Sequence, residues 1–166
     1  IESIFREASF PENLFRTLLI SSGKVNHLID NEKIKAATLT GSEYAGSKVA
    51  EQAGKNLKKT VMELGGSDPY IVFADADLDK CVETAVTGRM INTGQSCIAA
   101  KRFIVVEEIA DAFTEKVTAK MKQLKGGDPV DDTSDFGPMA RPDLRDDLDE
   151  QVQKSVKMGA ELLLGG

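Results

Sequence analysis

Residues 34–64, IKAATLTGSEYAGSKVAEQAGKNLKKTVMEL, carry the pattern that decides the fold. A short apolar run at 34–40 leads into Gly41-Ser42, an amphipathic stretch extends to about residue 52, and a second apolar run follows at 59–64. The order strand, turn, helix, strand is typical of a parallel α/β sheet, in which a helix crosses between neighbouring strands. We therefore expect two parallel strands joined by one helix.

Glycines mark the ends and the close contacts of these predicted elements. Gly54 is expected to end the helix, whereas Gly46 lies inside it, where glycine is less favourable than alanine by about 1 kcal/mol. Gly46 is therefore predicted to serve packing or a close approach. Upstream, residues 16–22 are predicted to form another strand, which Gly23 ends, and a short helix is expected over 24–30.

The alternation of strands and helices continues beyond Gly65-Gly66. Residues 75–78 supply helix-start chemistry, and apolar periodicity marks the later helices. The predicted elements are strands at 70–73 and 102–106 and helices at 78–92, 109–124 and 143–158. The chain opens without Met and closes on a strand-like run at 161–166 that needs a partner, so an internal piece of a longer protein is expected.

Composition excludes several classes of protein. The 166 residues carry 27 acidic and 21 basic side chains, a formal net charge of −6, which argues against nucleic acid as the main partner. No apolar run approaches the roughly 20 residues that cross a bilayer, and no signal peptide is evident, so we expect a soluble, cytoplasmic protein with no membrane partner. Two cysteines and one histidine cannot supply the usual four zinc ligands, so no metal site is expected.

The turn at Gly41-Ser42 is a candidate anion site. Free backbone N–H groups and the positive end of a helix favour a group such as a pyrophosphate at a strand-to-helix turn. Ser42 also suits the N-cap position of the helix. The spacing is not the dinucleotide-binding Gly-x-Gly-x-x-Gly pattern, so a plain capped turn remains the alternative.

Glu63 is a candidate general base. It ends an apolar strand directly before Leu64-Gly65-Gly66, where we expect it to be partly shielded from water, as suits a base near neutrality. The glycines allow close approach to a ligand. The alternative, which is commoner for glutamates in general, is an ordinary surface residue.

Cys97 is a candidate nucleophile. It follows the small polar loop 92–96, and if residues 98–100 turn helical, the helix N-terminus would favour the reactive thiolate. The alternative is an inert buried thiol, which is the interpretation given to Cys81 inside the helix predicted at 78–92. His27 and Arg102 are interpreted as structural, although Arg102 could also pair with a substrate carboxylate.

Three motifs in order resemble the aldehyde dehydrogenase superfamily. They are Thr40-Gly41-Ser42, Glu63-Leu64-Gly65-Gly66 and Asn92-Thr93-Gly94-Gln95-Ser96-Cys97, and the 34 residues that separate Glu63 from Cys97 match that family too. Segments 65–69, 99–103 and 137–141 are most similar to bacterial succinate-semialdehyde dehydrogenases. The resemblance implies an α/β fold: residues 1–64 would be the C-terminal part of a Rossmann-like parallel-sheet dinucleotide-binding domain. Residues 65–166 would be the N-terminal part of an α/β catalytic domain that carries the nucleophile.

The resemblance also implies a chemistry. An aldehyde, with succinic semialdehyde expected, would be oxidised to its acid with NAD or NADP: Cys97 would attack the carbonyl and Glu63 would activate the water that hydrolyses the thioester. The backbone N–H of Cys97 would be one oxyanion donor. Cofactor contacts would come from the remaining matched positions, which are Gly41, Ser42, Leu64, Gly65 and Gly23.

The resemblance places further cofactor and oxyanion groups outside this sequence, so we expect the chain alone to be inactive and the full-length protein to be the enzyme, as a dimer or tetramer. An aldehyde dehydrogenase of another substrate range is an alternative, and so is an acylating relative that releases no free acid, against which the retention of Glu63 argues. A non-catalytic relative is a second alternative, against which the pair of Glu63 and Cys97 speaks. Ala99 occupies the position where some relatives carry a second cysteine, so no local disulfide switch is expected.

Overall fold

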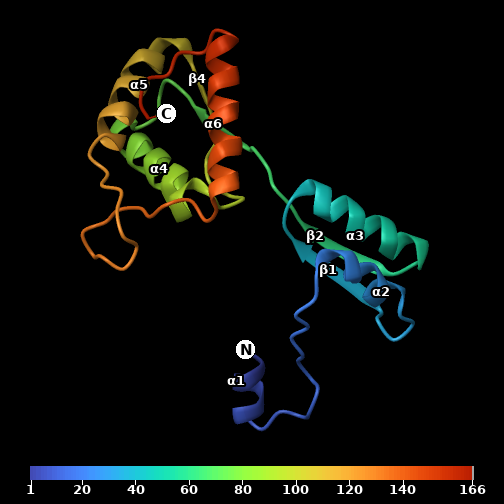
Figure 1. Ribbon diagram of the computed structural model, residues 1–166. Helices are drawn as coiled ribbons and strands as arrows, with labels where there is room; N and C mark the ends of the chain where they lie inside the picture. The colour runs from blue at the N-terminus through green and yellow to red at the C-terminus, as the bar shows by residue number, and fades with distance from the viewer. Residues whose placement is uncertain (166) are drawn as a thin grey trace. The chain divides into compact units, whose positions relative to one another are not determined.

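The computed structural model describes residues 1–165 and divides the chain into two compact units, Ile1–Gly65 and a second one that begins at Gly66 (Figure 1). Each unit is built around one pair of parallel strands with a helix between them. The predicted α/β class is confirmed by these two strand, helix, strand repeats.

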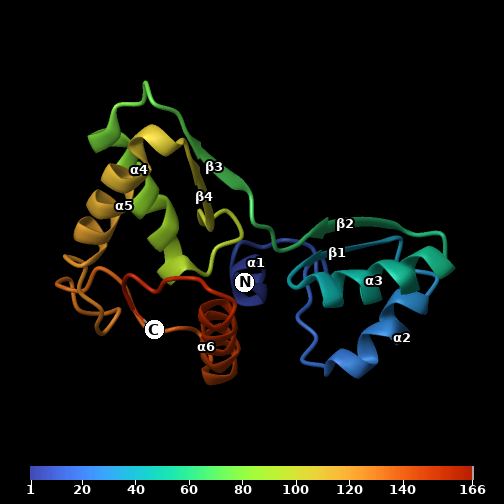
Figure 2. The ribbon, with the colours of Figure 1, turned by 90° about the horizontal axis from the view of Figure 1, so that it is seen from above.

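The first unit contains the segment that decides the fold. Strands β1 (Ala36–Thr40) and β2 (Lys59–Glu63) pair in parallel, with Ala36 opposite Lys59 and Thr40 opposite Glu63. Helix α3 (Glu43–Lys55) connects them and lies along one face of the pair (Figure 2). The register brings the last residues of both strands to the same edge, which is the edge at which α/β proteins bind ligands.

Helix α2 (Val25–Asp30) packs against α3 and follows the 3-10 turn η1 (Ser22–Lys24). The Asp30 carboxylate accepts hydrogen bonds from the side-chain amides of Gln52 and Asn56, and these bonds hold the pKa of Asp30 below its usual range. The Lys58 ammonium donates to the Ile29 carbonyl and, at 2.7 Å, to the Asn31 carbonyl. Polar contacts therefore fix the end of α2.

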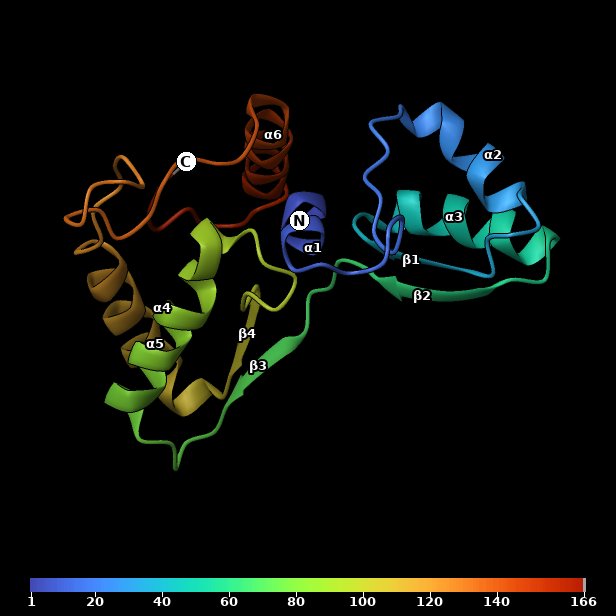
Figure 3. The same cartoon turned by 90° about the horizontal axis from the view of Figure 1, so that it is seen from below.

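The second unit places strands β3 (Pro69–Val72) and β4 (Arg102–Val105) in parallel, joined through helix α4 (Leu78–Met90) and the turn η2 (Ile91–Gly94). Helix α5 (Glu107–Met121) lies beside α4 (Figure 3). Asp77 caps α4 through its Oδ1, which accepts from the Lys80 N–H at 3.2 Å, so the predicted helix start is confirmed. The core of this unit consists of Val72, Val82, Ala85 and Phe113.

Two further helices are described, one in each unit. Helix α1 (Glu2–Glu7) opens the first unit, and Glu2 accepts from Arg16 at 2.7 Å. Helix α6 (Pro142–Lys157) closes the second and begins with proline at its first position, where the missing N–H has no effect on the helix. No helix between residues 1 and 165 is long and apolar enough to cross a membrane.

Two of the predicted strands do not form within residues 1–165. Residues 16–21 form no strand, and Leu19 is 97% exposed. The run at 161–165 also forms no strand, while Gly166 lies outside the described residues. A strand exists only through hydrogen bonds to a neighbour, and residues 1–165 offer neither run a paired strand.

Helix ends also differ from expectation. Gly54 does not end α3, which continues to Lys55, because the left-handed turn that reverses the chain is made by Leu57 at φ 53°. Helix α4 ends at Met90 rather than at residue 92, since Asn92 adopts a left-handed backbone at φ 50°.

Candidate active site

The first unit carries one candidate site, at the shared edge of β1 and β2. The Gly41 N–H donates to the Glu63 carbonyl at 3.0 Å, which joins the two motifs that the sequence singled out. Ser42 then begins α3: its Oγ accepts from the Ala45 N–H at 3.2 Å, so the predicted N-cap is confirmed. A hydroxyl that accepts in a cap still has its own O–H to donate.

Some of the N–H groups at the N-terminus of α3 have no hydrogen-bond acceptor within residues 1–65. The N–H groups of Glu43 and Tyr44 occupy the first helical turn, where no intrahelical acceptor exists, and within residues 1–65 no side chain accepts from them. Together with the Ser42 O–H they form a set of donors at the positive end of a helix, which suits a phosphate group.

Gly46 lets α3 approach the end of β2. A Cβ at Gly46 would lie 2.5 Å from Leu64 Cδ2 and 2.8 Å from Leu64 Cδ1. The predicted close-approach role of Gly46 is therefore confirmed, and the partner is Leu64. Gly65, next in the chain, is exposed and has nothing within 4 Å of its Cβ position.

Glu63 is exposed, so the expected shielding of its side chain is wrong for this chain. Side chains alternate between the two faces of a strand. Leu64 contacts α3, and Met62, which is half-buried, shares its face; Glu63 and the 61%-exposed Val61 point to the opposite face. Within residues 1–65 no helix covers that face, which leaves the carboxylate in water.

Gly23 does not lie at the end of a strand. It sits in the exposed turn η1, with nothing within 4 Å of its Cβ position. The structure thus brings Gly41, Ser42, Glu63 and Leu64 together at one edge, and it does not bring Gly23 into that group by any contact within the first unit.

The second unit carries another candidate site, the Cys97 loop, defined as residues 91–101. Asn92, Thr93 and Gly94 adopt left-handed conformations in succession, at φ 50°, 57° and 74°. Cys97 follows and is exposed, whereas Cys81 is half-buried beside the core of its unit. Of the two thiols, Cys81 therefore fits the inert role, as predicted, and Cys97 is accessible to a reagent.

Residues 98–100 form a turn and not the expected helix. The Ala99 N–H donates to the Ser96 carbonyl at 3.1 Å, and the Ala100 N–H donates to the Gly88 carbonyl of α4 at 3.0 Å. The second bond draws the chain back toward α4 before β4 begins, so a helical turn cannot propagate. The expected placement of Cys97 at a helix N-terminus is wrong.

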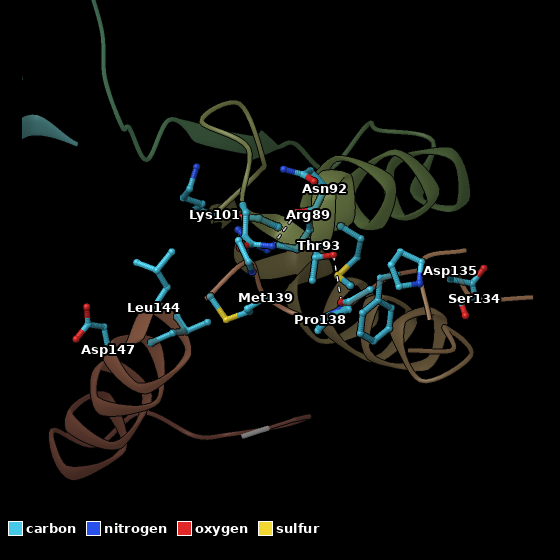
Figure 4. Close-up of a pocket in the computed structure, with 18 of the residues that line it drawn as sticks. Arg89, Asn92, Thr93, Lys101, Ser134, Asp135, Pro138, Met139, Leu144 and Asp147 are labelled. Atoms are coloured by element: carbon cyan, nitrogen blue, oxygen red, sulfur yellow. Dashed lines mark hydrogen bonds between the residues drawn. The ribbon is translucent and has the colours of Figure 1, made fainter. Parts of the chain in front are cut away.

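Two cations hold the Cys97 loop instead. The Arg89 guanidinium, from the last turn of α4, donates to the Ala100 carbonyl at 2.9 Å and to the Gly94 carbonyl at 3.0 Å. The Lys101 ammonium donates to the carbonyls of Cys97 at 2.9 Å, Ala99 at 3.1 Å and Ser96 at 3.2 Å. Figure 4 shows both side chains on the wall of a cavity. Arg89 joins Gly94 to Ala100, and Lys101 binds three of the carbonyls between those two residues.

The loop is also tied to residues 137–140. Thr93 Oγ1 donates to the Gly137 carbonyl at 3.3 Å, and Gln95 Oε1 accepts from the Ala140 N–H at 2.9 Å. Between the loop, this segment and α6 lies an open cavity of about 1550 Å³. The roles of Arg89, Lys101 and Gln95 were not predicted from the sequence, although basic residues near the end of a helix commonly bind its carbonyls.

Comparison with known proteins gives these sites a context. The model of the "Aldehyde dehydrogenase family" matches residues 1–166. The chain belongs to the aldehyde dehydrogenase family. Among its relatives, "Succinate-semialdehyde dehydrogenase [NADP(+)]" of Mycolicibacterium paratuberculosis is 51% identical over 166 residues, all of this chain and 35% of the relative. "Succinate semialdehyde dehydrogenase [NAD(P)+] Sad" of Escherichia coli is also 51% identical, over all of this chain and 36% of the relative.

Solved structures agree with the family assignment. Succinic semialdehyde dehydrogenase from Streptococcus pyogenes, determined in complex with NADP+ as the cofactor, has a TM-score of 0.95 and 38% identity. The match covers 99% of this chain and 36% of that one. The chain thus spans about a third of the length of the relatives it matches, and the fold of aldehyde dehydrogenases is confirmed over nearly all of it.

Proposed function

We propose that the full-length protein oxidises succinic semialdehyde to its carboxylic acid with NADP or NAD. The observation that carries this proposal is the 51% identity, over every residue of the chain, to proteins named as succinate-semialdehyde dehydrogenases. The exposed Cys97 on a firmly held loop supports it, because a nucleophile must be both accessible and fixed. Residues 1–64 would belong to the cofactor-binding domain and residues 65–166 to the catalytic domain.

The cofactor would accept a hydride from the substrate carbon. Gly41 and Ser42 would hold its pyrophosphate through the donors at the start of α3, and the edge of β2 would place Leu64 and Gly65 beside its nicotinamide end. The free N–H groups and the Ser42 O–H fit such an anion. Gly23, in the exposed turn η1, would contact the adenine side of the cofactor.

Cys97 would start the reaction. Its thiolate attacks the aldehyde carbon, a C–S bond forms, and the carbonyl oxygen takes the negative charge. Loss of hydride from that carbon leaves a thioester on Cys97. Glu63 would then remove a proton from water, which attacks the thioester; the C–S bond breaks, the acid leaves, and the thiolate is restored.

The Cys97→Ala variant tests the proposal in the full-length protein. With succinic semialdehyde and NADP, reduced cofactor should form with the parent and not with the variant, while cofactor binding measured by calorimetry stays unchanged. Cys81→Ala is the matched control, because it removes the thiol that lies beside the core and should keep its activity. Turnover by Cys97→Ala would remove Cys97 from the mechanism.

Glu63→Gln separates the two halves of the reaction. The substitution removes the base but keeps the size of the side chain, so the rapid first formation of reduced cofactor should persist while steady turnover slows. Stopped-flow absorbance measures both phases. Equal steady rates for the variant and the parent would exclude the base role of Glu63.

A further inference from the structure

Lys101 has all of its hydrogen-bond donors engaged with the Cys97 loop. An ammonium carries three N–H donors, and here they meet three carbonyls, those of Ser96, Cys97 and Ala99, at 3.2, 2.9 and 3.1 Å. The three carbonyls come from within four consecutive residues. Because all three bind the same ammonium, they point to the same side of the backbone. Lys101 itself contacts no atom of the Cys97 side chain by any hydrogen bond in residues 1–165.

The carbonyl positions fix the direction of the neighbouring N–H groups. A trans peptide is planar, and its C=O and N–H point in opposite directions. Because the Ser96 carbonyl points to the Lys101 ammonium, the N–H of Cys97 points away from it. The Cys97 carbonyl also points to the ammonium, so the N–H of Ile98 points away from it.

The third peptide of the set shows this geometry directly. The Ala99 carbonyl accepts from Lys101, and the N–H of the same peptide, on Ala100, donates to the Gly88 carbonyl of α4. By contrast, the N–H groups of Cys97 and Ile98 have no acceptor among residues 1–165. Both residues are exposed, and Ile98 is 76% exposed, so the two donors are available to a ligand.

We propose that Lys101 is a positioning residue for the nucleophilic step: it turns the N–H groups of Cys97 and Ile98 away from itself and holds them as donors for the oxygen of the substrate. The role rests on the proposed function of Cys97. When the C–S bond forms, negative charge develops on the carbonyl oxygen, and preorganised N–H donors stabilise it more than they stabilise the aldehyde. Lys101 acts through the backbone and does not touch the reacting atoms.

The size of the effect follows from the loss of alignment. Removing one oxyanion donor lowers kcat by about 100- to 1000-fold in well-studied enzymes. Lys101→Met leaves the donors in place but frees the peptides that carry them, so we expect kcat to fall by about 10- to 100-fold. The aldehyde itself has little charge on its oxygen, so its KM should stay within about threefold.

The test uses the full-length protein and two reactions of the same thiol. Oxidation of succinic semialdehyde passes through an oxyanion; methylthiolation of Cys97 by methyl methanethiosulfonate, a substitution at sulfur, does not. In Lys101→Met, kcat should fall at least about tenfold more than the rate of methylthiolation, which peptide mass spectrometry follows. The labelling rate of Cys81 serves as an internal reference for the fold.

Lys58→Met is the matched control. Lys58 also binds backbone carbonyls, those of Ile29 and Asn31, but it belongs to the first unit and lies outside the Cys97 loop. Its kcat should match that of the parent. An unchanged kcat in Lys101→Met would overturn the positioning role, and so would equal falls in kcat and labelling, which would mean that the whole loop had moved. A parent that forms no reduced cofactor would overturn the proposed function and this role with it.

Discussion

Substitution of Gly46 by alanine tests how closely α3 approaches the end of β2. Carbon atoms in ordinary contact are about 3.5 to 4.0 Å apart. A Cβ at this position would lie 2.5 and 2.8 Å from the two Leu64 methyl carbons and 3.2 Å from Cγ. The overlap of about 1 Å obliges Leu64 to change rotamer or α3 to move.

Two opposing terms set the magnitude. Alanine is favoured over glycine within a helix by about 1 kcal/mol, while overpacking of a closed site costs about 1 to 3 kcal/mol. The Gly46→Ala variant should therefore be unchanged or destabilised by up to about 2 kcal/mol. Gly54→Ala is the matched control on the same helix, because nothing lies within 4 Å of its Cβ position, and it should be stabilised by about 0.5 to 1 kcal/mol.

Hydrogen exchange of the α3 and β2 amides in the full-length protein measures both effects. One kcal/mol changes the opening equilibrium about fivefold, so Gly54→Ala should exchange about two- to fivefold more slowly than the parent. Gly46→Ala should exchange at least about twofold faster than Gly54→Ala.

A second background isolates the contact. Leu64→Ala removes the three carbon atoms that the new Cβ would meet. In that background, Gly46→Ala should slow the exchange of the α3 and β2 amides, as Gly54→Ala does in the parent. Two results would refute the reasoning: equal protection by the two single substitutions, or no change in the effect of Gly46→Ala when Leu64 is alanine.

Two further predictions concern the N-cap and the half-buried phenol of Tyr70. Ser42→Ala removes the cap of α3 and an O–H donor, so affinity for NADP by calorimetry should fall about three- to tenfold; Ser47→Ala, from within α3, should leave it unchanged. Burial and a contact with Cys81 raise the pKa of Tyr70. The neutral phenol therefore contributes stability below pH about 10, which is lost as the pH rises toward the folded value. Melting temperatures at pH 9 and 10.5 should diverge less for Tyr70→Phe than for the parent; Tyr44→Phe, at a 74%-exposed site, should behave as the parent does.

Local signals predicted the elements whose partners follow closely in the chain. Strands β1 and β2 and the Ser42 cap were predicted because the apolar runs, the capping residue and Gly46 all lie within 31 residues. Residues 16–22 have the composition of a strand, but pairing decides a strand and composition does not reveal a partner. The same limit applies to the run at 161–166.

The sequence predicted the family of the site but not the surroundings of its side chains. Ordered motifs indicated the family, yet the exposure of Glu63 depends on which face of β2 a helix covers, and this is a tertiary property. The bonds from Arg89 and Lys101 to backbone carbonyls follow no sequence period. Cys97 was predicted to lie near a helix N-terminus because residues 98–100 have a local propensity for helix. The bonds from the two cations, which shape the loop, leave no signal in that local sequence.

The left-handed run at Asn92, Thr93 and Gly94 has a consequence for how the Cys97 loop opens. Thr93 is β-branched, and such a residue at φ 57° is strained by about 1 to 3 kcal/mol. Arg89 binds the carbonyls of Gly94 and Ala100, so the backbone after Thr93 cannot relax without breaking these bonds. The loop amides that donate hydrogen bonds, those of Gln95, Ala99 and Ala100, should therefore exchange their hydrogens at one common rate, because they are released in the same opening event.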